Sequence, residues 1–146
     1  MSGVPVPILE LLPHTGTARL LTAVVRCDDA SVLAVGEIRA DHPLVRDGQA
    51  PAFLAIELGA QAAAAMESMT RRGAPPSGPV RGRLVRIRDA QFAHDTLPVN
   101  TPLDVTVHVL ATASPLAVYR IRVCLEGVER ATATLSTYAT GPAAAS

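Results

Sequence analysis

The chain has 146 residues, carries 13 basic and 13 acidic side chains, and is 49% hydrophobic. This length and composition exclude a disordered segment and predict a single domain over residues 1–146 with a full core. The zero net charge excludes a general electrostatic attraction to nucleic acid or to an anionic membrane.

Targeting segments and metal sites are not expected either. The first residues lack a basic stretch and include Glu10, and Glu57 and Gln61 interrupt the longest apolar run. Cys27 and Cys124 lack the close spacing of a zinc site or a disulfide framework. The lack of a signal sequence and of a membrane span predicts a cytoplasmic protein. Because no His, Asp and Glu set has metal-ligand spacing, we also predict that it holds no metal or cofactor.

The first part of the chain predicts a short apolar segment followed by a hairpin. Residues 5–13 read as a short helix or turn. Residues 20–26 and 31–39 are apolar and rich in β-branched side chains, with an Asp-Asp turn signal between them. Residues 40–50 are polar and contain proline and glycine, which predicts a loop.

A long helix is predicted over residues 51–72. Pro51 suits a first helical position, where its missing N–H is not needed. Gly73 and the prolines after it mark the end of the helix. The helix is apolar on nearly every side as far as Met66, which is typical of a buried helix.

Four strands follow, and their short connections predict antiparallel pairing. In the first of them Val85 and Ile87 alternate with Arg86 and Arg88. To cover so apolar a helix, the sheet must curl around it. The predicted architecture is therefore α+β, a hotdog fold in which a curled antiparallel sheet wraps around one long buried central helix. The four strands cover residues 81–94, 103–110, 116–125 and 128–138.

Glu57 and Gln61 form the one polar stripe on this helix. They are four residues apart and so lie on the same face. A buried carboxylate is costly and usually has a raised pKa, and such carboxylates are often functional. The alternative is that this stripe faces solvent or forms hydrogen bonds within a dimer interface.

His42 is the second candidate for chemistry. It lies in the loop before the helix, 15 residues before Glu57. A histidine titrates near neutral pH and can act as a general base, and loops often carry such residues. The residue alone would equally suit an ordinary surface position. His14, in the first segment, is interpreted as structural or pocket-lining, whereas His94 and His108 lie in predicted strands without an evident partner.

All thirteen basic residues are arginines, and four of them fall in one predicted strand. A basic strand can dock an acidic carrier protein or the phosphate of its phosphopantetheine. An ordinary solvated strand face is the alternative, because surface charges alone seldom identify a partner. The four residues are Arg81, Arg83, Arg86 and Arg88.

The segment DHPLVRDGQAPAFLAIELGAQAAAAM resembles the signature of β-hydroxyacyl-(acyl-carrier-protein) dehydratases. In that family a loop histidine precedes a proline that opens the helix, a helical acid and an Ala-Gln pair. These positions match His42, Pro51, Glu57 and Gln61 here. The segment LLPHTGTARLLTAVV also resembles the opening of that family. The run APAFLAIELGAQAAAA is similar to the dehydratase-like proteins of aryl-polyene biosynthesis clusters.

The resemblance implies a hydro-lyase that turns a 3-hydroxyacyl thioester into a trans-2-enoyl thioester in a fatty-acid-like or polyene pathway. The substrate would arrive on the phosphopantetheine of an acyl carrier protein or of CoA. His42 would remove the α-proton and Glu57 would protonate the departing hydroxyl. The N–H of Ala52 would bind the enolate oxygen, and Gln61 would hold Glu57 in place. The resemblance also implies a homodimer or heterodimer of hotdog chains, with the catalytic pair drawn from two subunits.

The sequence departs from the family pattern at three points, and two alternative functions stay open. The loop after His42 is about one residue longer, Ala52 replaces a glycine, and Thr22 replaces an acidic residue. One alternative is an acyl-thioesterase on the same fold, in which the helical carboxylate acts and the histidine is dispensable. The other is a non-catalytic hotdog subunit of a heterodimeric dehydratase.

Overall fold

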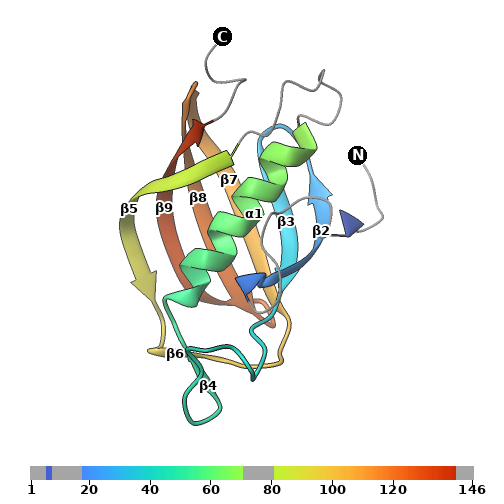
Figure 1. The fold of residues 1–146 in the computed structure, drawn as a ribbon, viewed down its shortest axis with the longest axis vertical. Helices are drawn as coiled ribbons and strands as arrows, with labels where there is room; N and C mark the ends of the chain where they lie inside the picture. The colour runs from blue at the N-terminus through green and yellow to red at the C-terminus, as the bar shows by residue number, and fades with distance from the viewer. Residues whose placement is uncertain (1–5, 8–17, 71–80, 141–146) are drawn as a thin grey trace.

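The structure is a computed structural model that describes residues 6–7, 18–70 and 81–140 (Figure 1). Its described residues form one helix, α1 (Leu54–Thr70), and nine strands. The strands of the main sheet are β1 (Val6–Pro7), β2 (Leu21–Cys27), β3 (Ser31–Gly36), β5 (Arg81–Phe92), β7 (Leu103–Ala113), β8 (Leu116–Leu125) and β9 (Val128–Thr140). A separate small sheet consists of β4 (Gln49–Pro51) and β6 (Thr96–Pro98).

The main sheet curls around α1. Its strand order is β1-β2-β3-β7-β8-β9-β5, and every neighbouring pair is antiparallel. Figure 1 shows α1 lying across the concave face. The strand that follows the helix, β5, is at the far edge beside β9. The predicted α+β hotdog architecture is confirmed.

The core lies between α1 and the concave face of the sheet. Helix side chains such as Ala55, Leu58 and Ala62 are fully buried against Val105 and Ile121 from the central strands. This arrangement explains the apolar composition of the helix, because most of its side chains as far as Met66 are buried. None of the helices among the described residues is long and apolar enough to span a membrane.

Gly59 of α1 lies directly against Ile121 of β8. A Cβ atom on Gly59 would be 2.9 Å from both Cβ and Cγ2 of Ile121. Alanine is favoured over glycine in a helix by about 1 kcal/mol, but overpacking a core costs about 1–3 kcal/mol. We expect Gly59→Ala to lower the free energy of unfolding by about 1–2 kcal/mol, measured by urea denaturation. An unchanged or higher unfolding free energy would contradict this close packing.

The predicted hairpin is present, and its turn depends on Asp28. The Asp28 carboxylate accepts hydrogen bonds from the backbone N–H groups of Ala30 and Ser31, both at 2.8 Å. These two backbone bonds hold the pKa of Asp28 below its usual value. The turn signal seen in the sequence is therefore a side-chain-capped turn between β2 and β3.

Two predictions about local structure were wrong. The helix begins at Leu54, because Pro51 is the last residue of β4 and pairs with Thr96 of β6. Residues 6 and 7, expected in a short helix or turn, form strand β1 beside β2. The remainder of the segment 5–13 and the predicted helix end at residues 71–73 lie outside the described residues.

Candidate active site

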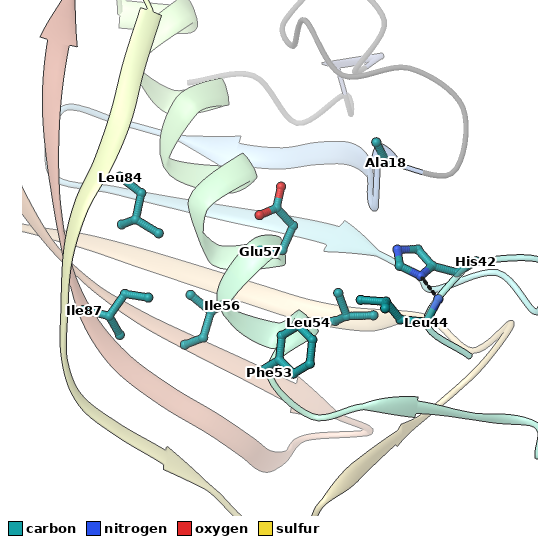
Figure 2. A pocket seen from close by; sticks show the side chains of 9 residues that line it. All are labelled: Ala18, His42, Leu44, Phe53, Leu54, Ile56, Glu57, Leu84 and Ile87. Carbon is teal, nitrogen blue, oxygen red and sulfur yellow. Dashed lines mark hydrogen bonds between the residues drawn. The ribbon is translucent and has the colours of Figure 1, made fainter. Parts of the chain in front are cut away.

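His42 and Glu57 line the same pocket, which has a volume of about 480 Å³. Figure 2 shows His42 beside Ala18 and Leu44 on one side of the view, an apolar wall of Leu84, Ile87 and Ile56 on the other, and Glu57 between them. Both residues belong to a single chain here, whereas the resemblance implied that the pair comes from two subunits. The complete lining is Ala18, His42, Leu44, Phe53, Leu54, Ile56, Glu57, Leu84 and Ile87.

Glu57 lies in the first turn of α1 and is half-buried. One carboxylate oxygen, Oε1, accepts a hydrogen bond of 3.1 Å from the side-chain Nε2 of Gln61. Because α1 begins three residues later than predicted, Glu57 is close to the helix start rather than in its middle. Its carboxylate lines the pocket and is hydrogen-bonded to Gln61, one turn further along the helix.

Gln61 is the most highly connected polar side chain of the site and is only 1% exposed. Its Oε1 accepts hydrogen bonds from the N–H groups of Leu20, at 2.8 Å, and Leu21, at 3.1 Å. Its Nε2 donates to the Ala18 carbonyl at 2.7 Å and also to Glu57. Gln61 thus joins the residues before β2 to the helix and holds the Glu57 carboxylate through a hydrogen bond.

The His42 ring is held by its own loop. Its Nδ1 accepts a hydrogen bond of 3.1 Å from the backbone N–H of Leu44. In a neutral imidazole, a nitrogen that accepts a hydrogen bond carries no proton, so the proton of this ring is on Nε2. The Leu44 N–H was not identified from the sequence. Its position two residues after His42 is the signal of a local side-chain-to-backbone turn.

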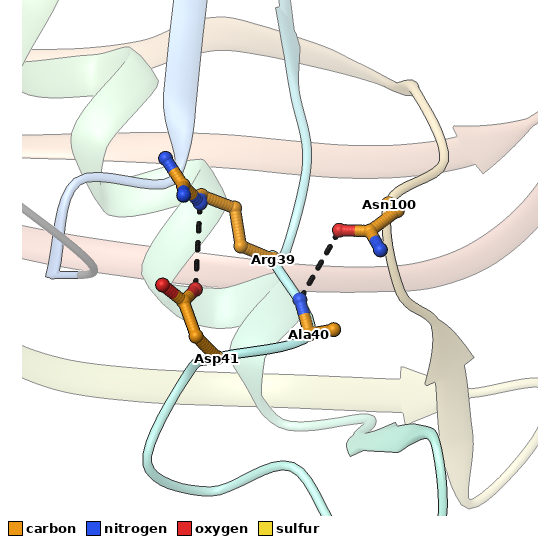
Figure 3. A network of polar contacts seen from close by, with 4 residues as sticks. All are labelled: Arg39, Ala40, Asp41 and Asn100. Atoms are coloured by element: carbon orange, nitrogen blue, oxygen red, sulfur yellow. Dashed lines mark hydrogen bonds and ion pairs between the residues drawn. The ribbon is translucent and has the colours of Figure 1, made fainter.

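The chain before His42 is fastened to a distant loop (Figure 3). The side-chain Oδ1 of Asn100 accepts a hydrogen bond of 3.1 Å from the N–H of Ala40, and the N–H of Asn100 donates to the Ile38 carbonyl at 2.7 Å. Arg39 and Asp41 form an ion pair of 3.4 Å. Because both side chains of this ion pair are exposed, the two hydrogen bonds of Asn100 contribute more to the position of the loop than the ion pair does.

Ala52 does not present its N–H to the pocket. That N–H donates to the Asp95 carbonyl at 2.9 Å. The prediction of Ala52 as an enolate donor assumed a helix that starts at Pro51. Because α1 starts at Leu54, the N–H groups at its N-terminus are those of Phe53 and Leu54. Among the described residues, nothing accepts a hydrogen bond from these two N–H groups. Phe53 and Leu54 both line the pocket.

The departure at Thr22 lies away from the pocket. Thr22 is exposed on β2, and its hydroxyl donates to the Val35 carbonyl of β3 at 2.8 Å. It therefore takes part in the hairpin and not in the site. The substitution gives no structural reason for a loss of catalysis.

The basic strand predicted from the sequence is β5, and its alternation is broken. The register shifts between Leu84 and Arg86, so Leu84 and Ile87 face the helix while Val85 is more exposed than either. Figure 2 shows Leu84 and Ile87 projecting toward Ile56 of α1. Arg83, Arg86 and Arg88 are exposed, and the side chain of Arg81 is outside the described residues. The bulge was not evident from the sequence, because a one-residue insertion leaves no compositional mark.

Within residues 18–70 and 81–140, no three His, Cys, Asp or Glu side chains come together as metal ligands. The site described so far consists of a histidine, a carboxylate, an amide that orients the carboxylate and an apolar wall. Such a set can move protons at an acyl group that lies against the wall.

The comparisons with known proteins agree with this chemistry. The family model described as ApeP dehydratase, of the ApeP-like group, matches residues 6–145. The chain belongs to the ApeP-like dehydratase family. This confirms the resemblance to dehydratase-like proteins of aryl-polyene clusters that the sequence indicated. No curated protein matches the chain.

Solved structures show that the ApeP-like fold is shared with other hotdog proteins. The dehydratase heterocomplex ApeI:P from Xenorhabdus doucetiae has a TM-score of 0.84 and 23% identity, over 96% of this chain and 95% of that chain. A hypothetical thioesterase with coenzyme A from Streptococcus pneumoniae has a TM-score of 0.60 and 13% identity, over 82% and 85%. A mutant of the phenylacetic acid degradation protein PaaI from Thermus thermophilus has a TM-score of 0.59 and 22% identity, over 79% of this chain and 90% of that chain.

Proposed function

We propose that this ApeP-like dehydratase acts on a 3-hydroxyacyl thioester carried on the phosphopantetheine of an acyl carrier protein or of CoA. The α-carbon loses a proton, the bond from the β-carbon to its hydroxyl breaks, and the products are a trans-2-enoyl thioester and water. The observation that carries the proposal is that His42 and Glu57 line one pocket beside an apolar wall. That wall suits an acyl chain, and the two polar groups suit the two proton transfers.

In this proposal His42 removes the α-proton through Nε2, and Glu57 protonates the departing hydroxyl. Nε2 can accept a proton only if Nδ1 carries one, whereas Nδ1 accepts a hydrogen bond from the Leu44 N–H in the free chain. Catalysis by His42 therefore requires the ring to release Leu44 when the substrate enters. The N–H groups of Phe53 and Leu54 would bind the enolate oxygen in place of Ala52.

A second hotdog chain is the expected partner. The similar structure from Xenorhabdus doucetiae is a dehydratase heterocomplex, which supports a heterodimer over a lone chain. Phe53 is 54% exposed beside the pocket, so part of the pocket wall lies open to water in the single chain. A partner that covers this opening would exclude water from the reacting acyl group.

The direct test is incubation of the chain, alone and with its hotdog partner, with a 3-hydroxyacyl carrier protein or a pantetheine thioester. We expect loss of one water by mass spectrometry and exchange of the α-proton in deuterated water. Both signals should fall by about 10²–10⁴-fold in His42→Gln. Absence of both signals in the paired protein, under conditions in which a known dehydratase turns over, would refute the proposal.

A thioesterase is the second candidate, and the Leu44 contact is the observation that favours it. If His42 keeps its proton on Nε2, Glu57 remains as the only pocket carboxylate able to act as base or nucleophile among the described residues. Release of free thiol that persists in His42→Ala and disappears in Glu57→Ala would identify this activity. Formation of the enoyl product without free thiol would exclude it.

A further inference from the structure

Arg130 lies where strand β9 is irregular. Its neighbours on either side pair with consecutive residues of β8, so Arg130 itself is left out of this pairing. Its backbone carbonyl accepts a hydrogen bond of 2.9 Å from the N–H of Ala93, the residue that follows β5. A bulge of this kind redirects the side chain that it carries. The side chain of Arg130 is therefore not constrained to the alternation of the strand.

The guanidinium of Arg130 reaches the small sheet. One terminal nitrogen, Nη2, donates a hydrogen bond of 3.0 Å to the backbone carbonyl of Thr96 in β6. Within the described parts of the chain, no other hydrogen bond joins the small sheet to the main one. Two strands of three residues each are marginally stable by themselves. The small sheet therefore depends on this bond and on the burial of Ala50 and Leu97.

The small sheet leads directly into the first turn of α1, which lies just above it in Figure 1. Thr96 pairs with Pro51, and the N–H of Ala52 donates to the Asp95 carbonyl at 2.9 Å. The Ala52 carbonyl in turn accepts a hydrogen bond of 3.0 Å from the N–H of Ala55 in α1. The peptide groups on both sides of Ala52 are thus fixed, one by the loop before β6 and the other by the helix.

Phe53 and Leu54 follow Ala52, and their N–H groups are the ones proposed to bind the enolate oxygen. Such donors act only when they are held at hydrogen-bonding distance from the place where the negative charge develops. A displacement of about 1 Å, caused far from the chemistry, can cost about 100-fold in rate. A series of hydrogen bonds and strand pairs connects Arg130 with these donors through β6 and Ala52.

Stability alone does not explain the arginine at this position. Nε of Arg130 is buried and has no hydrogen-bond partner among the described residues. A buried donor without an acceptor lowers the free energy of unfolding, which offsets what the bond to Thr96 contributes. Removal of the whole guanidinium should therefore change the stability little. A loss of activity can then be distinguished from a loss of the fold.

We infer that Arg130 is a positioning residue for the reaction. It holds β6 where the first turn of α1 presents the N–H groups of Phe53 and Leu54 to the substrate. Arg130 does not line the pocket, so it acts through this turn and not on the substrate itself. The inference rests on the proposed function, which assigns the enolate oxygen to these two N–H groups.

Arg130→Met tests the inference, because methionine keeps much of the apolar stem and loses every donor. In the paired protein we expect kcat for enoyl formation to fall by about 10–100-fold. KM should stay within about twofold, because the apolar wall that binds the acyl chain is unchanged. The melting temperature should shift by less than about 4 °C. Arg130→Lys keeps a donor for the Thr96 carbonyl and should restore most of the lost kcat.

Amide hydrogen exchange of the free chain gives a measurement that does not depend on turnover. In Arg130→Met the N–H of Ala52 should exchange at least about 10-fold faster than in the wild type, while that of Val105 in the central sheet is unchanged. Arg120→Met is the matched control. Arg120 is also half-buried and donates one hydrogen bond, of 3.1 Å to the Thr134 hydroxyl, but this bond lies within the main sheet. Its variant should keep the wild-type kcat and the wild-type exchange of Ala52.

Three results would overturn the inference. One is a kcat for Arg130→Met no lower than that of the Arg120 control, and another is exchange of the Ala52 N–H that Arg130→Met leaves unchanged. A third is a loss of kcat that Arg130→Lys shares in full, because the donor to Thr96 would then not matter.

A second variant covers the case in which Arg130→Met does not fold. Arg130→Gln is polar but too short to reach the Thr96 carbonyl, and the same expectations apply to it. A wild-type pair that forms no enoyl product would refute the proposed dehydration. The exchange of the Ala52 N–H would still show whether Arg130 holds the start of the helix, so the two failures are separate results.

Discussion

Glu57→Gln is expected to lower kcat/KM for dehydration by about 10²–10⁴-fold without unfolding the protein. Glutamine has the shape of glutamate, and its side-chain oxygen can still accept the hydrogen bond that Gln61 Nε2 donates. What it loses is the ability to deliver a proton to the departing hydroxyl. The measurement is kcat/KM for enoyl formation by the paired protein, with circular dichroism to verify the fold.

Glu67→Gln is the matched control for this substitution. Glu67 belongs to the same helix, accepts a hydrogen bond from the Tyr119 hydroxyl and does not line the pocket. Its glutamine variant should keep dehydratase activity within a few-fold. If Glu57→Gln also kept its activity within a few-fold, Glu57 would not be the acid and the proposed mechanism would fail.

Gln61→Leu is expected to reduce the free energy of unfolding by about 3–5 kcal/mol. Leucine has a similar volume but leaves the N–H groups of Leu20 and Leu21 and the carbonyl of Ala18 without the partners they have now. Each buried polar group left unsatisfied costs about 1–3 kcal/mol, and these costs are only partly additive. Urea denaturation measures the loss of unfolding free energy directly, and the melting temperature should fall by about 10 °C.

The control for Gln61→Leu is the same change at Gln91, which is exposed on β5. A surface substitution of this kind should alter the unfolding free energy by about 0.5 kcal/mol or less. Equal effects at the two positions would mean that the hydrogen bonds of Gln61 contribute little. In that case Gln61 could be treated as a local support for Glu57 rather than as a structural tie.

The periodic parts of this fold were predictable because burial leaves a pattern in the sequence. The long apolar helix, the hairpin before it and the strands after it follow from helical and strand periodicity and from turn residues. The identities of His42 and Glu57 as site residues came from the resemblance and from the cost of a carboxylate on an apolar helix. Both residues do line one pocket.

Features made by long-range pairing were not predictable from local pattern. Pro51 suits a helix start, yet its pairing with Thr96 places it in β4 and moves the first helical residue to Leu54. The same pairing uses the N–H of Ala52 on Asp95 and removes it from the pocket. The bulge at Val85 likewise depends on a partner far along the chain, and so do three of the four hydrogen bonds of Gln61.

The fastening of the His42 loop also has a consequence for the order of folding. The chain before His42 is held by Asn100, 60 residues further on, and the turn before α1 is held by Asp95 and β6. Contacts between segments so far apart close large loops, and they form after nearby contacts have reduced the chain entropy. The hairpin and helix can assemble early from local contacts. The His42 loop can reach its place only once the second half of the chain has been made and has paired with it.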